Sequence, residues 1–152
     1  MNKISCISFG VILSFFVHGV ARADQKAAIL RIQQLGGTVM PVAQNDPRLS
    51  VKIPAKTQDG RTVKDADLAP LADLARTQPT DAGVIEVDLR SVEVGDQALS
   101  YIRGLTQLEV INLYRTRVTD TGLSQISSLV NLEHLNLYGT AVTDAGLKSL
   151  KS

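Results

Sequence analysis

Cysteine and histidine are nearly missing from this sequence. Its single cysteine is Cys6, and its two histidines are His18 and His134. Cys6 and His18 lie in a leader that we expect to be removed, so the mature chain would keep only His134. Such a chain has no disulfide and no thiol to protect in an oxidising compartment, and it lacks the usual cysteine and histidine ligands of zinc. We therefore expect neither a metal nor a cofactor.

An excess of charge of one sign is also missing. Lysine and arginine number 16 against 15 aspartates and glutamates, and loss of Lys3 and Arg22 with the leader would change the net charge from +1 to −1. Proteins that bind nucleic acids carry a clear excess of clustered basic residues, so we expect no nucleic-acid partner. The sequence also lacks a nucleophile elbow, a phosphate loop and a nucleophile beside a base. We therefore expect no catalytic residues and no enzyme activity.

A signal peptide is predicted at residues 1–23. Lys3 supplies the positive start, "ISCISFGVILSFFVHGV" is an apolar run of 17 residues, and "ARA" ends in the small-x-small pattern of a cleavage site. Cleavage after Ala23 would export the chain to a periplasm or out of the cell, without a stable membrane anchor. An uncleaved membrane anchor is the alternative, since the apolar run approaches the lower length limit of a spanning helix.

A repeat is the most informative feature of the sequence. "NLYRTRVTDTGL" at residues 112–123 returns as "NLYGTAVTDAGL" at residues 136–147, with nine of the twelve letters unchanged and an interval of 24 residues. The apolar positions persist one interval earlier, at residues 84–102, and a weaker copy begins at Val63. Between these two copies, seven extra residues within "ARTQPTDAG" predict a loop. Such an interval is typical of stacked units that bury their apolar faces against one another.

Each unit is predicted to be a strand, a turn and a short helix. Ile111 and Leu113 alternate with polar neighbours as in a strand, whereas Leu123, Ile126 and Leu129 recur every three residues, as on one face of a helix.

The turn "VTDTGL" offers Thr119 or Asp120 as the N-cap of the helix that follows. Asp96, Asp120 and Asp144 share one position in three units, as metal ligands could. Calcium, however, needs about six to eight converging oxygens, whereas a carboxylate at the start of its own helix is stabilised by the free amides and the dipole. We therefore interpret these aspartates as caps of their own helices.

Residues 24–62 are predicted to cap the N-terminal end. A helix comes first, ended by Gly36–Gly37, with its apolar side formed by Ala28, Ile29, Ile32 and Leu35. After it, "SVKI" predicts a short strand, and Asp59–Gly60 predicts an exposed turn.

The pattern LxxLxxLxLxxTxVTDxGLxxL, followed over residues 84–150, resembles the leucine-rich repeat in the 24-residue form of many exported bacterial proteins. The resemblance implies an α/β fold: a short right-handed leucine-rich-repeat solenoid with an N-terminal helical cap. Its repeats would cover residues 63–152, as one degenerate and three good units. One departure is that Val92, Thr116 and Thr140 replace the usual Asn or Cys, although a threonine hydroxyl can still bond a buried turn carbonyl.

In such a solenoid the strands line one face, and the residues between the leucines point outward from it. Tyrosine and arginine are the residues that most often carry interface energy. We therefore predict that this face binds another protein, through the candidates Arg90, Glu109, Asn112, Tyr114, Arg115, Glu133, His134, Asn136 and Tyr138.

Other interpretations of this face and its edge stay open. Tyr114 and Tyr138 could simply stack on each other across the strands, and Asn112 and Asn136 could be solvated surface. A glycan of the envelope could use the tyrosine and asparagine columns instead. A structural role is a third possibility, in which the chain pairs with a second copy through an uncapped C-terminal edge strand near residues 134–138.

Overall fold

A five-stranded sheet with helices along one side forms the part of the protein that the computed structural model describes, residues 23–77 and 83–150. The strands lie in the order of the sequence: β1 (Thr38–Pro41), β2 (Leu49–Lys52), β3 (Val84–Asp88), β4 (Val110–Asn112) and β5 (His134–Asn136). β1 runs antiparallel to β2, and the other neighbours are parallel. The prediction of a mixed α/β fold is therefore confirmed.

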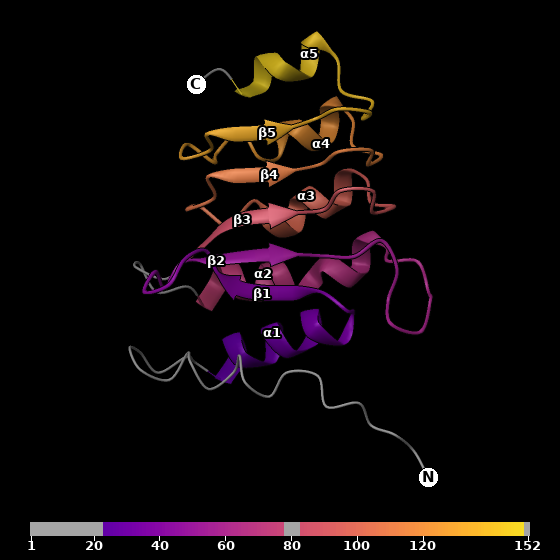
Figure 1. The fold of residues 1–152 in the computed structure, drawn as a ribbon. Coiled ribbons are helices and arrows are strands. Elements are labelled where there is room, and N and C mark those ends of the chain that lie inside the picture. The colour runs from indigo at the N-terminus through magenta and orange to yellow at the C-terminus, as the bar shows by residue number, and fades with distance from the viewer. Residues whose placement is uncertain (1–22, 78–82, 151–152) are drawn as a thin grey trace.

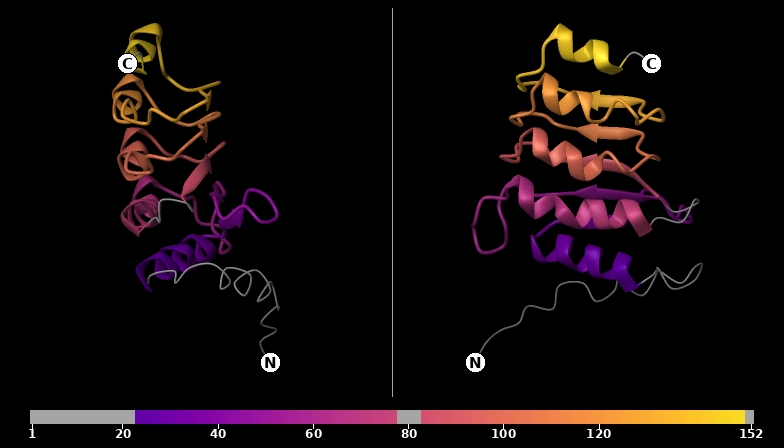
Figure 2. Two further views of the ribbon diagram at one scale, coloured as in Figure 1. Left: turned by 90° about the vertical axis from the view of Figure 1, so that its left-hand side faces the viewer. Right: turned by 180° about the vertical axis from the view of Figure 1, so that it is seen from behind.

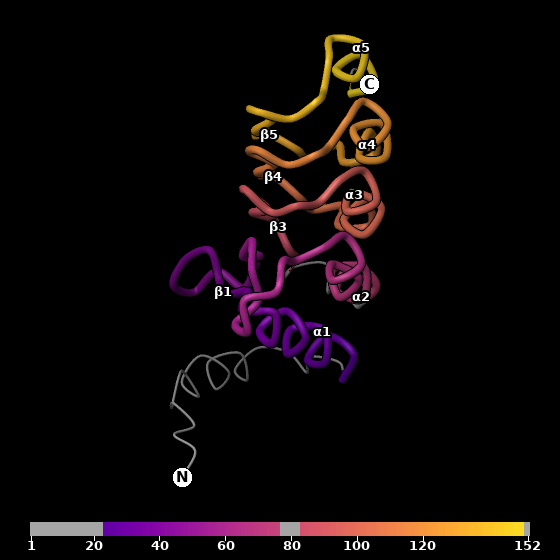
Figure 3. Tube along the Cα trace, turned by 90° about the vertical axis from the view of Figure 1, so that its right-hand side faces the viewer, coloured from indigo at the N-terminus to yellow at the C-terminus, as the bar shows by residue number. Residues whose placement is uncertain are grey.

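The helices stack in one layer beside the sheet, as the side views in Figures 2 and 3 show. Each helix packs against the next along the chain. They are α1 (Ala23–Gln34), α2 (Ala69–Thr77), α3 (Asp96–Ile102), α4 (Asp120–Ser124) and α5 (Asp144–Leu147), with 3-10 turns η2 (Asp65–Leu68) before α2 and η3 (Lys148–Leu150) after α5.

The register of the parallel strands follows the 24-residue interval. Val87 lies beside Ile111, and Ile111 lies beside Leu135. Their side chains point between the sheet and the helices, where Val87 and Ile111 are at most 1% exposed. The same layer buries Leu113 and Leu123 completely. The strand and helix positions predicted from the apolar pattern are thus confirmed as the core.

The N-terminal segment contains the predicted helix and turn, and one strand that the sequence did not indicate. Gly36 has φ of 86°, and the amides of Gly36 and Gly37 donate to carbonyls of the last turn of α1 at 2.9 Å. Gly60, with φ of 84°, forms the predicted turn beside the Lys56–Thr62 bridge. The predicted "SVKI" strand corresponds to β2, whereas β1 was missed.

Hydrogen bonds between successive units correct the interpretation of the aspartate column. Thr119 is the N-cap of α4 and Thr143 is the N-cap of α5, each accepting from an amide of its own helix. The carboxylate of Asp96 accepts from the amide and the hydroxyl of Thr119, both at 2.7 Å. Asp120 accepts from Thr143 in the same way, again at 2.7 Å. These carboxylates therefore bind the cap of the next unit rather than their own helix.

Two glycines make this contact possible. A methyl group on Gly122 would overlap Oδ1 of Asp96 and lie 3.0 Å from its Cα, and Gly146 stands in the same relation to Asp120. In the preceding unit the position is held by Ala98, whose amide and that of Gly95 donate to Asp65 at 3.1 and 2.8 Å. The unit-to-unit contact thus fixes the helices relative to one another, and with them the strands.

Two predictions fall outside the described residues. The signal peptide at residues 1–23 lies almost wholly in residues 1–22, and the loop within "ARTQPTDAG" falls largely on residues 78–82. Across residues 23–77 and 83–150, none of the helices has the length and apolar character needed to cross a membrane.

Candidate binding face

The face of the sheet away from the helices carries the candidate residues, and β3, β4 and β5 each end there in the same side-chain hydrogen bond. Oδ1 of Asn112 accepts from the amide of Tyr114 at 3.1 Å, and Oδ1 of Asn136 accepts from that of Tyr138 at 3.0 Å. Asp88 accepts from the amide of Arg90 at 3.1 Å. This is the local turn that Asn and Asp side chains favour. The asparagines therefore hold the backbone after the strand, a role that the column pattern alone did not reveal.

The residue after each of these turns takes a left-handed conformation. Ser91, Arg115 and Gly139 occupy the same position in three units, with φ of 60°, 53° and 73°. Glycine adopts such a conformation without strain, which suits Gly139 to this place. The amides of Ser91 and Arg115 donate to the carbonyls of Tyr114 and Tyr138, at 2.7 and 2.8 Å. The turn therefore positions the tyrosines of neighbouring units side by side.

Tyr114 and Tyr138 stack as the sequence suggested. Their ring centroids are 5.4 Å apart and the planes differ by 10°. Tyr114 is half-buried, whereas Tyr138 remains 69% exposed. The guanidinium carbon of Arg115 lies 5.1 Å from the centroid of the Tyr114 ring. The stack thus leaves the Tyr138 ring open to solvent, while a cation lies against the ring of its partner Tyr114.

Asp88 holds two cations at the carboxyl end of β3. Nη2 and Nε of Arg90 donate to its Oδ2 at 2.6 and 2.9 Å, and Nζ of Lys52 lies 3.9 Å away. Burial alone would raise the pKa of Asp88, but the hydrogen bonds and charges of Arg90 and Lys52 outweigh it, so the pKa lies below its usual value. A single buried carboxylate therefore faces two positive side chains.

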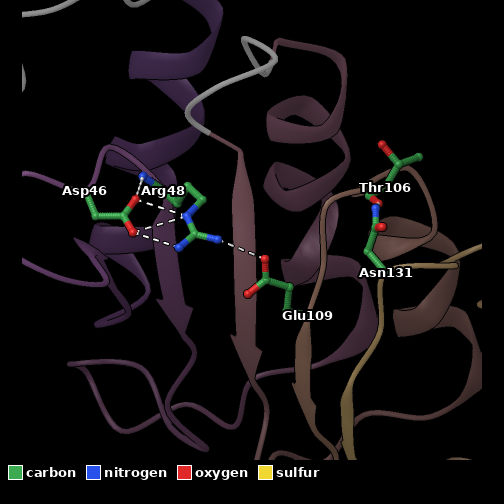
Figure 4. Close-up of polar contacts among 5 residues, drawn as sticks. All are labelled: Asp46, Arg48, Thr106, Glu109 and Asn131. Atoms are coloured by element: carbon green, nitrogen blue, oxygen red, sulfur yellow. Dashed lines mark hydrogen bonds and ion pairs between the residues drawn. The ribbon is translucent and has the colours of Figure 1, made fainter.

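At the opposite end of the strands, Arg48 crosses the sheet (Figure 4). It binds Asp46 with Nε and Nη2 at 2.8–3.1 Å and reaches Oε1 of Glu109 with Nη1 at 2.9 Å. These bonds from Arg48 lower the pKa of Asp46. Neither Asp46 nor Arg48 was among the predicted residues, although the Asp-x-Arg pattern at 46–48 repeats at 88–90, where Arg90 binds Asp88 in the same way.

A shallow groove of about 480 Å³ adjoins Arg48 and Glu109. Asn131 donates to the carbonyl of Thr106 at 2.8 Å on one side of it. Glu133 and the exposed Val130 also line the groove.

Seven of the nine predicted residues fall into two groups at opposite ends of the strands, and each group also contains charged residues that were not predicted. We call the first the carboxyl-end rim, and its members are Lys52, Lys64, Arg90, Tyr114, Arg115, Arg117 and Tyr138. We call the second the amino-end rim, and its members are Asp46, Arg48, Glu86, Glu109, Glu133 and His134. Glu109 precedes β4 and Tyr114 follows it, five residues further along the chain, roughly 16 Å in extended chain. Asn112 and Asn136 lie between the two rims. The side-chain oxygen of each already accepts a hydrogen bond from a backbone amide.

In residues 23–77 and 83–150, no three His, Cys, Asp or Glu side chains come together as a metal site would require. Neither the comparison with protein-family models nor the comparison with curated proteins gives a match to this chain.

Proposed function

We propose that this chain is an exported protein of the leucine-rich repeat type, a short solenoid that binds another protein through its carboxyl-end rim. The repeated sequence pattern supports the assignment, together with the 24-residue register of β3, β4 and β5. Each of these strands leads into a short helix that packs on the next. The chain would act as a binding module without catalysis of its own.

One observation carries this function: the exposed ring of Tyr138 stacks on Tyr114, and the guanidinium of Arg115 lies over the Tyr114 ring. Tyrosine and arginine dominate interface energies because they offer large, rigid contact area together with polar groups. A tyrosine held by stacking loses little side-chain entropy when a partner covers it. If the pair served only the sheet, covering it would bring no gain in binding.

The test is a comparison of partner capture by the full chain and by the double variant Tyr114→Ala/Tyr138→Ala. We expect a specific protein, quantified by mass spectrometry from cells that express the chain, to be retained by the wild type and lost with the double variant. Tyr101→Ala, the same change on the helix side in α3, is the matched control and should retain it. Circular dichroism melts of all three proteins check folding. Equal capture by the wild type and the double variant would show that the carboxyl-end rim is not the binding surface.

A second candidate is self-association through β5, the last strand of the sheet. In the unit containing β4, Leu108, Ile111, Leu113 and Leu123 are at most 1% exposed. Their counterparts one interval later are Leu132, Leu135 and Leu137, which are only half-buried, and Leu147, which is 43% exposed. A second copy, paired antiparallel along β5, would cover these side chains and continue the sheet.

Sedimentation velocity over about a tenfold range of concentration tests this second candidate. A concentration-dependent dimer that Leu135→Asp abolishes supports pairing through β5. A monomer throughout the range removes it and leaves the carboxyl-end rim as the proposed binding surface.

A further inference from the structure

The strand-lined face is electrically polarised, although the chain as a whole is close to neutral. The carboxyl-end rim holds five cations, which are Lys52, Lys64, Arg90, Arg115 and Arg117, and four of them pair with two carboxylates, Asp88 and Glu93. The amino-end rim holds four carboxylates, Asp46, Glu86, Glu109 and Glu133, against one arginine, Arg48. Composition cannot explain this separation, because lysine plus arginine nearly equals aspartate plus glutamate.

The cations of the carboxyl-end rim outnumber the carboxylates that face them. Arg90 and Lys52 share Asp88, at 2.6 and 3.9 Å. Arg117 and Lys64 share Glu93, at 3.2 and 3.9 Å. Among the described residues, no carboxylate lies within ion-pair distance of Arg115, whose guanidinium lies over the Tyr114 ring. The rim therefore retains unneutralised positive charge beside an exposed aromatic ring.

We propose that the carboxyl-end rim docks an acidic segment of the partner protein, an inference that rests on the proposed function. Carboxylates of the segment would bind Arg115, and also Arg90 and Lys52, which share the carboxylate of Asp88. Guanidinium groups match carboxylates in charge and in planar geometry. An apolar or aromatic side chain of the segment would cover the Tyr138 ring.

The polarity of the face also sets the direction of the segment. The carboxylates of the amino-end rim repel acidic side chains, so an acidic segment crosses the strands at their carboxyl ends instead of following them. From Lys52 on β2 to Tyr138 after β5 is three strand spacings, roughly 14 Å. An extended peptide covers this distance in about four residues.

The test selects ligands from a displayed library of random peptides about 12 residues long, a length that exceeds the rim. The immobilised target is the full chain. We expect the selected peptides to be enriched in aspartate and glutamate next to an aromatic or apolar residue. Raising salt from about 0.05 to about 0.5 M should weaken them at least about tenfold, because it screens exposed charges.

Arg115→Asn is the diagnostic variant, since asparagine tolerates the left-handed backbone at this position. It should weaken the selected peptides by at least about tenfold in Kd. Arg103→Asn, the same change at an exposed position after α3, is the control and should leave Kd unchanged. Denaturant unfolding of both variants checks that the fold persists.

The other outcomes separate this inference from the proposed function. Peptides that require Tyr138 but are neither acidic nor salt-sensitive would overturn the acidic segment and leave the binding rim standing. Peptides whose Kd is unchanged by Tyr138→Ala would overturn both the acidic segment and the binding rim. A single-stranded oligothymidylate that binds the rim more tightly than any selected peptide would also overturn the inference, because the positive charge would then serve phosphates.

Discussion

Replacement of Gly122 by alanine should destabilise the protein, although alanine is the better helix former. Inside a helix, Gly→Ala normally gains about 1 kcal/mol. Here the added methyl would overlap Oδ1 of Asp96 and approach its Cα to 3.0 Å. If the carboxylate moves away, it gives up its hydrogen bonds from Thr119 at 2.7 Å. Bonds to a charged group contribute about 1.5–3 kcal/mol each when lost, and overpacking costs about 1–3 kcal/mol.

The net expectation is a free energy of unfolding about 1–3 kcal/mol lower for Gly122→Ala, measured by urea unfolding with circular dichroism. A double-mutant cycle isolates the cause. In the background of Asp96→Ala the carboxylate is absent, so Gly122→Ala should cost less, with a coupling energy of about 1 kcal/mol or more. A variant Gly122→Ala as stable as the wild type would refute the account of how the units are joined.

Two further predictions concern the core and the acid limit. Leu113→Ala should lower the free energy of unfolding by about 2–5 kcal/mol, and Leu137→Ala by clearly less, because Leu113 is fully buried and Leu137 is not; urea unfolding of both variants checks the difference. Asp88 and Asp120 have pKa values below the usual 3.8, so the stability that they contribute is present above about pH 4 and is lost as the pH falls through their folded values. Urea midpoints at about pH 6 and about pH 3 should therefore differ less in Asp88→Asn and Asp120→Asn than in the wild type; an unchanged difference would show that neither carboxylate contributes.

The periodic part of the structure could be predicted from the sequence because one interval carries it. A 24-residue step sets which residues are neighbours in a parallel sheet, so the column of Tyr114 and Tyr138 followed directly from their spacing. The end of α1 at Gly36 was equally predictable, since a left-handed residue there is a local property of the chain.

Contacts that join distant or successive units could not be predicted in the same way. Arg48 and Glu109 are 61 residues apart, and nothing in their local sequence indicates that they meet. Asp96 is the first residue of α3, where a carboxylate usually accepts from the amides of its own helix. In this structure it accepts from Thr119, the N-cap of the next helix, instead. β1 was missed because only Val39 of its four residues is buried, so no apolar alternation marks it.

Photo-crosslinking from position 138 asks whether a partner protein covers the Tyr138 ring. In one variant of the full chain, expressed in cells, a benzophenone side chain replaces Tyr138. A second variant of the same chain carries the benzophenone at Val130, which is 78% exposed and precedes β5. A third variant carries the benzophenone at Ser127, which is exposed on the helix side. If the carboxyl-end rim binds a partner, position 138 should give a discrete crosslinked protein that is absent from position 127. Crosslinks confined to position 130 and joining two copies of this chain would contradict it and assign the binding surface to the edge of β5.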